Sequence, residues 1–191
     1  MKIILVRHGQ TTANHQHLIQ GWTDNPLNEK GKKEAHEAGK FLKTINYHAD
    51  RAFSSPLTRA IETGNIMLKE FSSIKEINLD FHFIERNFGP FEQKEVKTTF
   101  QNLLVKDFTY PGYENDKILL NRVKIGLDNL YKHYKDEDII IFCHSHVIKS
   151  FLILAEPNNY NFKTFIDNGS LHKFSYDGVK LKLLEFNLNR K

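Results

Sequence analysis

Cysteine is almost absent from this sequence, with a single residue, Cys143, among 191. One cysteine excludes an internal disulfide framework of the kind that stabilises small secreted domains. Cys143 ends an apolar run over residues 139–143, so we expect an inert, buried thiol rather than a reactive one. This cysteine usage predicts a cytoplasmic protein.

Long apolar runs are absent as well. The longest, at residues 139–143 and 151–155, suit core elements and fall far short of the about 20 residues that span a membrane. Arg7 and His8 interrupt the N-terminal apolar run too early for a secretory signal. We therefore expect neither a signal peptide nor a membrane association. Because no linker or repeat divides the chain, residues 1–191 are predicted to form a single domain.

Charge of one sign is concentrated only near the C-terminus. The formal net charge is +4, which in principle suits a nucleic-acid partner. The lysines, however, are spread along expected helix faces between acidic residues. Only the tail is consistently basic, with Lys180, Lys182, Arg190 and Lys191. We expect a small-molecule ligand in a cationic pocket and no nucleic-acid partner, and the sequence leaves the oligomeric state open between monomer and homodimer.

Strand and helix signals alternate along the chain. Residues 3–6 and 138–143 are apolar without alternation, which is typical of strands buried on both faces of a parallel sheet. Asn28 is a plausible helix N-cap, and Ser55 with Pro56 marks the start of a second helix. Further strands are expected at 52–54, at 77–83 and in a hairpin over 171–186, and further helices at 94–104, at 116–134 and up to 154. This alternation predicts an α/β fold, a three-layer sandwich with a mostly parallel central sheet.

The two buried strands each lead to a histidine. The first strand is followed by Arg7, His8 and Gly9, and the second by His144. Adjacent parallel strands would bring both imidazoles to the carboxyl edge of the sheet, where ligands of such folds bind. Arg59, at the start of a helix, would lie near the same edge, and helix N-termini favour anions. The combination predicts a phosphate site, because guanidinium groups bind phosphate oxygens bidentately and a histidine can act as a nucleophile.

The chain resembles the histidine phosphatase superfamily in its phosphoglycerate-mutase-like branch. The matching residues are 5–11 (LVRHGQT) with Asn14, 20–27 (QGWTDNPL), 54–63 (SSPLTRAIET), 85–89 (ERNFG), Pro111 and Gly112 with Glu114, and 139–144 (IIIFCH). They follow the order and spacing of the family from end to end, and the first and third motifs are the most specific. The resemblance implies an α/β/α sandwich with a helical lid insertion, here roughly residues 90–115.

The resemblance also implies roles for individual residues. His8 is expected to be the nucleophile that accepts the phosphoryl group on a ring nitrogen. Arg7, Arg59 and His144 are expected to hold this group, and Asn14 and Gln20 to bind its oxygens, with Gly21 and Ser145 completing the binding residues. The physics of phosphoryl transfer agrees, because the protein has mainly to position groups and neutralise charge. His8 must be neutral to attack, and neighbouring cations favour its neutral form.

The general acid implied by the resemblance is Glu85. A phosphate anion in the site is expected to raise the pKa of this glutamate, which suits a proton donor. The alternative is that Glu85 pairs with Arg86 or Lys94. Glu92 and Glu114 are weaker candidates for the same role.

Three positions depart from the family pattern. Ser145 stands where the family usually has glycine, and its hydroxyl or backbone N–H can still reach a phosphate. His146 has no counterpart that we can assign, so we expect a histidine at the surface or the edge of the core. Ala13 replaces a tryptophan of many mutases, which opens the pocket mouth or alters its wall. Late in the chain, Asn168 and Ser170 match a polar segment of the pattern and are expected to be structural.

Two other function classes, a metal-dependent enzyme and a non-catalytic binding module, are less consistent with the sequence. His15 with His17, and His144 with His146, have a spacing that puts two metal ligands on one side of a strand. No aspartate stands beside either pair, so we expect neither a metal nor a cofactor. A non-catalytic phosphate-binding module is disfavoured because both the nucleophile and the acid are present.

The sequence favours a phosphatase over a mutase. A cofactor-dependent mutase holds a substrate carboxylate with arginines, but between Gly89 and Tyr110 the only cations are Lys94, Lys97 and Lys106. We expect hydrolysis of small phosphate monoesters, with the mutase as the alternative. The lid aromatics either make the pocket tolerant of bulky or apolar esters or simply pack the lid. They are Phe88, Phe91, Phe100, Phe108 and Tyr110.

Overall fold

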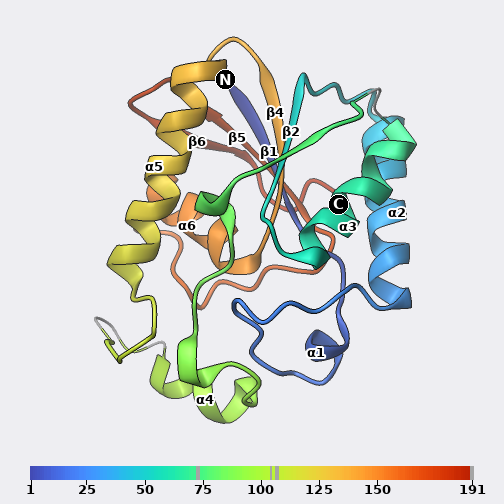
Figure 1. The fold of residues 1–191 in the computed structure, drawn as a ribbon. Coiled ribbons are helices and arrows are strands. Elements are labelled where there is room, and N and C mark those ends of the chain that lie inside the picture. Colours follow the sequence, from blue (N-terminus) through green and yellow to red (C-terminus); the bar gives the residue numbers. More distant parts are fainter. Residues whose placement is uncertain (72–73, 104, 106–107, 190–191) are drawn as a thin grey trace.

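The computed structural model describes residues 1–71, 74–103, 105 and 108–189, and a central six-stranded sheet organises them (Figure 1). The strand order is β3-β2-β4-β1-β5-β6. Four neighbouring strands are parallel, and β5 runs antiparallel to β1 and pairs with β6 in a hairpin. The strands are β1 (Lys2–Arg7), β2 (Arg51–Ser54), β3 (Ile77–Leu79), β4 (Asp138–Cys143), β5 (Leu171–Tyr176) and β6 (Leu181–Glu185).

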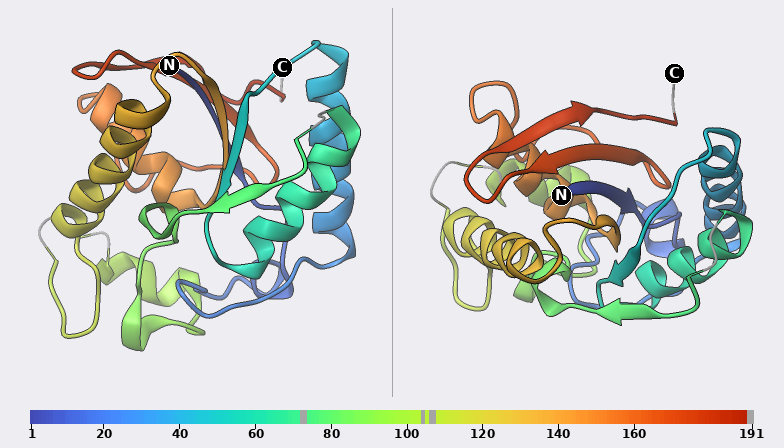
Figure 2. Two further views of the ribbon diagram at one scale, coloured as in Figure 1. Left: turned by 45° about the horizontal axis from the view of Figure 1, so that its top comes forward. Right: turned by 90° about the horizontal axis from the view of Figure 1, so that it is seen from above.

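Helices cover both faces of the sheet, as the two further views make clear (Figure 2). In β1, Ile3 and Leu5 face one core cluster, and Ile4 and Val6 face the other, because successive side chains of a strand point to opposite faces. The first cluster includes residues of α5 (Asp116–Tyr134) and α6 (Ser145–Ala155), and the second includes residues of α2 (Glu29–Thr44) and α3 (Thr58–Phe71). The predicted three-layer α/β/α sandwich is confirmed.

The register of β1 and β4 aligns the ends of the two strands. Arg7 lies opposite Cys143, and the His8 N–H donates to the Cys143 carbonyl at 3.0 Å. The ring centroids of His8 and His144 are therefore only 5.1 Å apart. The expectation that both imidazoles meet at the carboxyl edge of the sheet is confirmed.

The segment expected to form the lid lies beyond this edge, at the bottom of Figure 1. It contains a short 3-10 helix, η2 (Gly89–Phe91), and α4 (Val96–Leu103). A separate apolar cluster of Ile19, Phe88, Leu103 and Tyr113 holds the segment together. The loop after α1 (Thr12–His15) is tied to it, since the Ile19 N–H donates to the Lys94 carbonyl at 2.9 Å. We call residues 90–115 the lid segment below.

Some element boundaries differ from those expected. Asn28 caps α2 as predicted, but α3 begins at Thr58 rather than at Pro56. Asp24, from a distant loop, binds the Thr58 N–H at 2.8 Å, so a tertiary contact supplies the acceptor at that helix start. The strand expected at 77–83 ends at Leu79 because Asp80 caps the 3-10 helix η1 (Phe81–Phe83).

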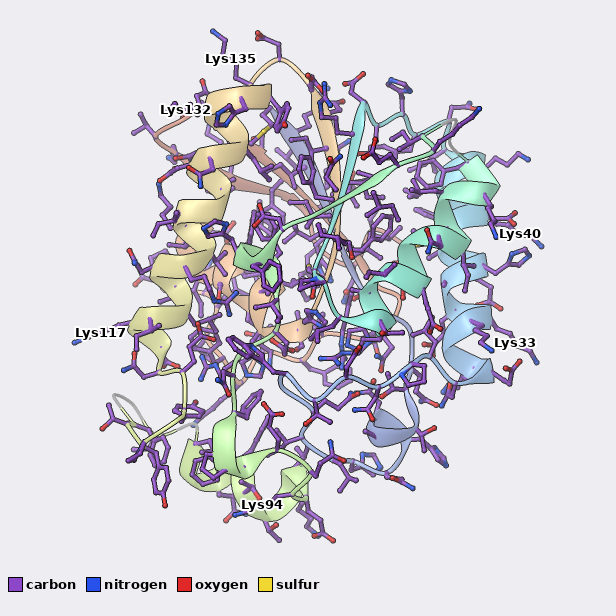
Figure 3. All side chains as sticks on the ribbon, viewed as in Figure 1. Lys33, Lys40, Lys94, Lys117, Lys132 and Lys135 are labelled. Carbon is purple, nitrogen blue, oxygen red and sulfur yellow. The ribbon has the colours of Figure 1, made fainter. Side chains whose placement is uncertain are left out.

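The described surface carries scattered positive charge. The labelled lysines of Figure 3 come from α2, the lid segment, α5 and the turn after α5, and they point outward at different places around the molecule. They are Lys33, Lys40, Lys94, Lys117, Lys132 and Lys135. Within the described ranges, the helices are all too short or too polar to cross a membrane.

Candidate active site

His8 lies at the end of β1, almost fully buried. Its Nδ1 is 2.7 Å from the Gly9 carbonyl oxygen, and a carbonyl can only accept, so Nδ1 carries the ring proton. This tautomer leaves a lone pair on Nε2. Burial lowers the pKa of His8 well below its usual 6.5, and Arg59, His144 and Arg7 lower it further. A pKa lowered in this way favours the neutral ring, in which Nε2 has the form that a nucleophile requires.

Two guanidinium groups lie near this ring, that of Arg59 buried and that of Arg7 partly buried. Arg7 donates to the Ile166 carbonyl, and Arg59 donates to Gly21 O at 2.7 Å and to Thr23 O at 3.0 Å. Burial lowers the pKa of Arg59 to about 10, so it stays charged at neutral pH. In the described part of the chain, Nε of both arginines has no hydrogen-bond partner. Two positive charges with unused N–H groups form a strong site for an anion.

Two side-chain amides, Asn14 and Gln20, line the same cavity. Asn14 Oδ1 accepts from the Thr11 N–H at 3.1 Å, and Gln20 Oε1 accepts from the Thr11 hydroxyl at 2.8 Å. Because the oxygens are engaged, the NH₂ groups remain to donate to a ligand. Gly21 also lines the cavity with φ at +56°, and an added Cβ would lie 2.1 Å from Glu92 Oε1. A glycine is therefore needed there to shape the loop whose carbonyl holds Arg59.

His144 does not line the cavity but lies behind His8, fully buried. Its Nε2 is 2.7 Å from the Ser55 hydroxyl. The Leu57 N–H donates to the same hydroxyl, so Ser55 links His144 to the segment just before α3. Burial and Arg59 lower the pKa of His144 well below 6.5. Ser145 does line the cavity as the first residue of α6, so the N-terminus of that helix faces the cavity.

Glu85 lines the cavity, and its carboxylate is held on one side. Oε1 accepts from the Arg86 N–H at 2.8 Å and from the His146 N–H at 3.2 Å, which leaves Oε2 to exchange a proton. Burial by itself raises the pKa of Glu85, whereas the hydrogen bonds that Oε1 accepts from backbone N–H groups favour the ionised carboxylate and lower it. The expected rise of this pKa in a phosphate-filled site stays a prediction.

The alternative partners for Glu85 are engaged elsewhere. The Arg86 guanidinium binds Tyr113 and Asp116, and the Lys94 ammonium lies over the Phe91 ring. The alternative that Glu85 forms an ion pair with either side chain is therefore wrong.

The two weaker candidates for the proton donor are engaged in other hydrogen bonds. Glu92 accepts from the N–H groups of Trp22 and Thr23, each at 2.8 Å. Glu114 receives two hydrogen bonds from Arg122, both at 2.8 Å. Neither glutamate lines the cavity, so the structure supports neither as a proton donor.

His146 is not where we expected it. It is only 3% exposed, it lines the cavity, and its Nδ1 lies 3.8 Å from Glu85 Oε1. Burial and Lys149 lower its pKa to about 3, so the ring is neutral. The prediction of a surface or core-edge histidine is wrong, because residues 162–168 fold back over the start of α6 and stack Phe162 on His146 at 5.7 Å.

The sequence did not lead us to expect Lys149 in the cavity. It lines the cavity, and its Nζ donates to the Phe162 carbonyl at 2.9 Å. Burial lowers the pKa of Lys149 to about 8. Lys149 follows Ser145 by four residues on one helix, and this spacing places both side chains on one face, a signal that was available in the sequence.

The cavity has a volume of about 640 Å³. Of the paired histidines, His17 and His146 line it, whereas His15 and His144 do not. Within the described ranges, no group of three or more His, Cys, Asp or Glu residues is arranged to hold a metal ion. The lining residues are Arg7, His8, Gln10, Asn14, His17, Leu18, Ile19, Gln20, Gly21, Arg59, Glu85, Phe88, Val96, Phe100, Ser145, His146, Lys149, Phe162, Lys163, Thr164, Phe165, Ile166, Asp167 and Asn168.

Comparison with known proteins matches nearly the whole chain to one family. The model of the histidine phosphatase superfamily (branch 1) matches residues 3–189. The uncharacterized phosphatase PhoE of Bacillus subtilis is 29% identical over 188 residues, 98% of this chain and 94% of that protein. A 2,3-bisphosphoglycerate-dependent phosphoglycerate mutase of Borreliella afzelii is 40% identical over 122 residues, 63% of this chain. The matched part covers only 45% of that mutase.

Solved structures share the fold over their full length. A phosphoglycerate mutase from Bacillus anthracis aligns with a TM-score of 0.85 at 25% identity, covering 98% of this chain and 92% of that one. A phosphoserine phosphatase mutant from Entamoeba histolytica, in complex with phosphoserine, aligns with a TM-score of 0.84 at 25% identity, covering 99% and 98%. The neighbours thus include both a phosphatase and a mutase.

Proposed function

This chain belongs to the histidine phosphatase superfamily, and we propose that it is a phosphatase that hydrolyses small phosphate monoesters through a phosphohistidine on His8. The observation that carries the proposal is the neutral His8 ring, whose Nε2 lone pair is kept free by the Nδ1 bond to Gly9. Two guanidinium groups and a glutamate at the same cavity supply the charge and the proton that the reaction needs.

The first step transfers the phosphoryl group to the enzyme. Nε2 of His8 attacks phosphorus, the ester P–O bond breaks, and the leaving oxygen takes a proton from Glu85 Oε2. The arriving phosphate dianion raises the pKa of Glu85, so this carboxyl takes up a proton from solvent before the P–O bond breaks. Arg7 and Arg59, which line the cavity, neutralise the oxygens of the transferring group.

The second step restores the enzyme. Glu85, now ionised, takes a proton from a water molecule that attacks phosphorus. The P–N bond to His8 breaks, and inorganic phosphate leaves. His8 ends neutral, as it began, and Glu85 ends protonated and returns its proton to solvent.

The lid segment supports a phosphatase over a mutase. Of its cations, Lys94 and Lys97 do not line the cavity, and Lys106 lies outside the described residues. Lys149 and Lys163 do line it, but neither offers the bidentate fork that an arginine presents to a carboxylate. The mutase remains the second candidate because part of the chain is 40% identical to one.

The decisive assay offers 3-phosphoglycerate and other phosphate esters, with and without 2,3-bisphosphoglycerate as a primer. We expect release of inorganic phosphate without the primer. Isomerisation that requires the primer would identify a mutase, and turnover of none of the esters would identify a binding module.

The phosphohistidine can be trapped directly. Wild-type protein quenched during turnover should carry a phosphate that is labile in acid and stable in base. His8→Ala should lose the label and reduce kcat by more than about a thousandfold, the scale seen when a nucleophile is removed. Substantial turnover by His8→Ala would contradict the assignment.

A further inference from the structure

The cavity is lined by two chemically different kinds of side chain. Charged and amide groups take part in the proposed reaction, and aromatic rings from separate parts of the chain make up a further part of the lining. These rings belong to Phe88, to Phe100 of α4, to His146 of α6 and to Phe162. We call these four residues the aromatic wall.

The aromatic wall is continuous. Phe88 and Phe100 stack with centroids 5.6 Å apart, and Phe88 meets His146 edge-on at 5.1 Å. His146 in turn stacks on Phe162 at 5.7 Å with an interplanar angle of 18°. The Phe162 backbone is fixed by the Lys149 ammonium. The wall is therefore a preorganised surface, assembled by contacts among residues far apart in sequence.

The aromatic wall adjoins the group that protonates the leaving oxygen. His146 donates its N–H to Glu85 Oε1 at 3.2 Å, and its ring Nδ1 lies 3.8 Å from the same oxygen. A leaving group must place its oxygen at Glu85, so the rest of that group extends along the wall. We propose that the aromatic wall is the leaving-group subsite and that the enzyme prefers phosphate esters of alcohols that carry an aromatic ring, a substrate class that rests on the phosphatase function proposed above.

The chemistry of the wall agrees with such a leaving group. His146 is neutral because burial lowers its pKa to about 3, so the whole wall is uncharged at neutral pH. An aromatic ring gains from stacking and from leaving water, whereas a charged group loses hydration there. Phe165, at the cavity and 75% exposed, loses part of its own exposure when a ring binds.

The other lid aromatics have a different role. Phe91, Phe108 and Tyr110 do not line the cavity, and Phe91 packs edge-on against Phe108 at 6.0 Å and Tyr110 at 5.0 Å. Phe91, Phe108 and Tyr110 therefore pack the lid, whereas Phe88 and Phe100 line the cavity, and tolerance of bulky or apolar esters stays a prediction.

The test compares esters whose leaving groups have similar basicity. 2-Phenylethyl phosphate, n-propyl phosphate and glycerol 3-phosphate all release an alkoxide, so intrinsic reactivity differs little between them. We expect kcat/KM for the phenylethyl ester to exceed that for the other two by at least about tenfold. Phe100→Ala should bring this ratio close to one, and Phe108→Ala, a lid aromatic away from the cavity, should keep it.

The ratio is measured on one preparation, so it does not depend on the fraction of folded enzyme in either variant. Phe162→Ala tests the other end of the wall and should lower the same ratio. Equal kcat/KM for the three esters in the wild type, or a clear preference for phosphoserine or 3-phosphoglycerate, would overturn the aromatic subsite while leaving the phosphatase intact. Absence of hydrolysis of every ester would instead contradict the proposed phosphatase function.

Discussion

Arg59 is almost completely buried, and its terminal nitrogens hold the carbonyl groups of Gly21 and Thr23 in the loop that carries Gln20. The same guanidinium lowers the pKa of His8. One planar group therefore shapes the loop and supplies fixed positive charge, which a lysine cannot do with a single ammonium.

Arg59→Lys keeps the positive charge but removes the planar guanidinium, whose paired N–H groups can donate two hydrogen bonds side by side. We expect kcat/KM for phosphate monoesters to fall more than about tenfold, which corresponds to about 1.4 kcal/mol of transition-state stabilisation. Steady-state kinetics measures the loss, and a thermal melt shows whether the loop or the whole fold is affected. Near-normal kinetics in a well-folded Arg59→Lys would show that only the point charge matters at this position.

Glu85 presents one free carboxylate oxygen to the cavity, which makes its chemistry testable through the leaving group. Glu85→Gln should reduce hydrolysis of an alkyl phosphate by about a hundredfold or more, because an alkoxide needs a proton to leave. Hydrolysis of 4-nitrophenyl phosphate should fall far less, since the nitrophenolate leaves without one. Parallel assays of both esters measure the difference, and equal losses would assign Glu85 to binding or structure.

At the scale of elements, the lid segment is tied to the loop after α1 through Glu92. Its carboxylate accepts from the N–H groups of Trp22 and Thr23 and from the Thr23 hydroxyl, at 2.6 to 2.8 Å. These contacts hold the loop that also carries Gly21, so Glu92 connects the cavity wall to η2 without facing the cavity.

Glu92→Ala removes these acceptors. We expect a loss of about 1–3 kcal/mol in the free energy of unfolding, because the exposed Trp22 N–H and the partly buried N–H and hydroxyl of Thr23 lose a charged acceptor. Denaturant unfolding measures this loss. Unlike Glu85→Gln, Glu92→Ala should reduce the rates of alkyl and nitrophenyl esters by the same factor, since it acts through geometry. If only the rate on the alkyl ester fell, Glu92 would instead be identified as the proton donor.

At the scale of the whole molecule, buried neutral histidines link stability to pH. Burial lowers the pKa of four of them below 6.5, to about 3 for His146 and His172. The other two are His8 and His144. In the unfolded chain these rings take up protons near pH 6.5, whereas in the folded chain they stay neutral. The unfolded state therefore binds more protons as the pH falls, and stability present above about pH 6.5 is lost below it.

We expect the free energy of unfolding to change little close to pH 7 and to fall toward pH 5, with each such histidine contributing up to about 1.4 kcal/mol per pH unit. Urea unfolding at several pH values measures the slope. His172→Gln, away from the cavity, should make the slope shallower, whereas the exposed His48, replaced in the same way, should leave it unchanged. A stability that stays constant down to pH 5 would contradict the linkage.

Much of this architecture follows from local sequence. The continuous apolar runs of β1 and β4 predicted buried parallel strands, and their register followed from that burial. The sequence therefore predicted that His8 and His144 would meet at one edge. The Asn28 cap was equally local, because the cap and the Gly31 N–H that donates to it lie within one helical turn.

Other features were decided only by tertiary structure. The start of α3 at Thr58 depends on Asp24, which lies 34 residues earlier in the chain. The burial of His146 and the aromatic wall depend on residues 162–168 returning over the start of α6. Strand burial and helix periodicity are set by neighbours along the chain, so a sequence pattern reveals them. Contacts between distant loops depend on how whole elements pack, and no local pattern of apolar and polar residues encodes which loop will cover a given helix end.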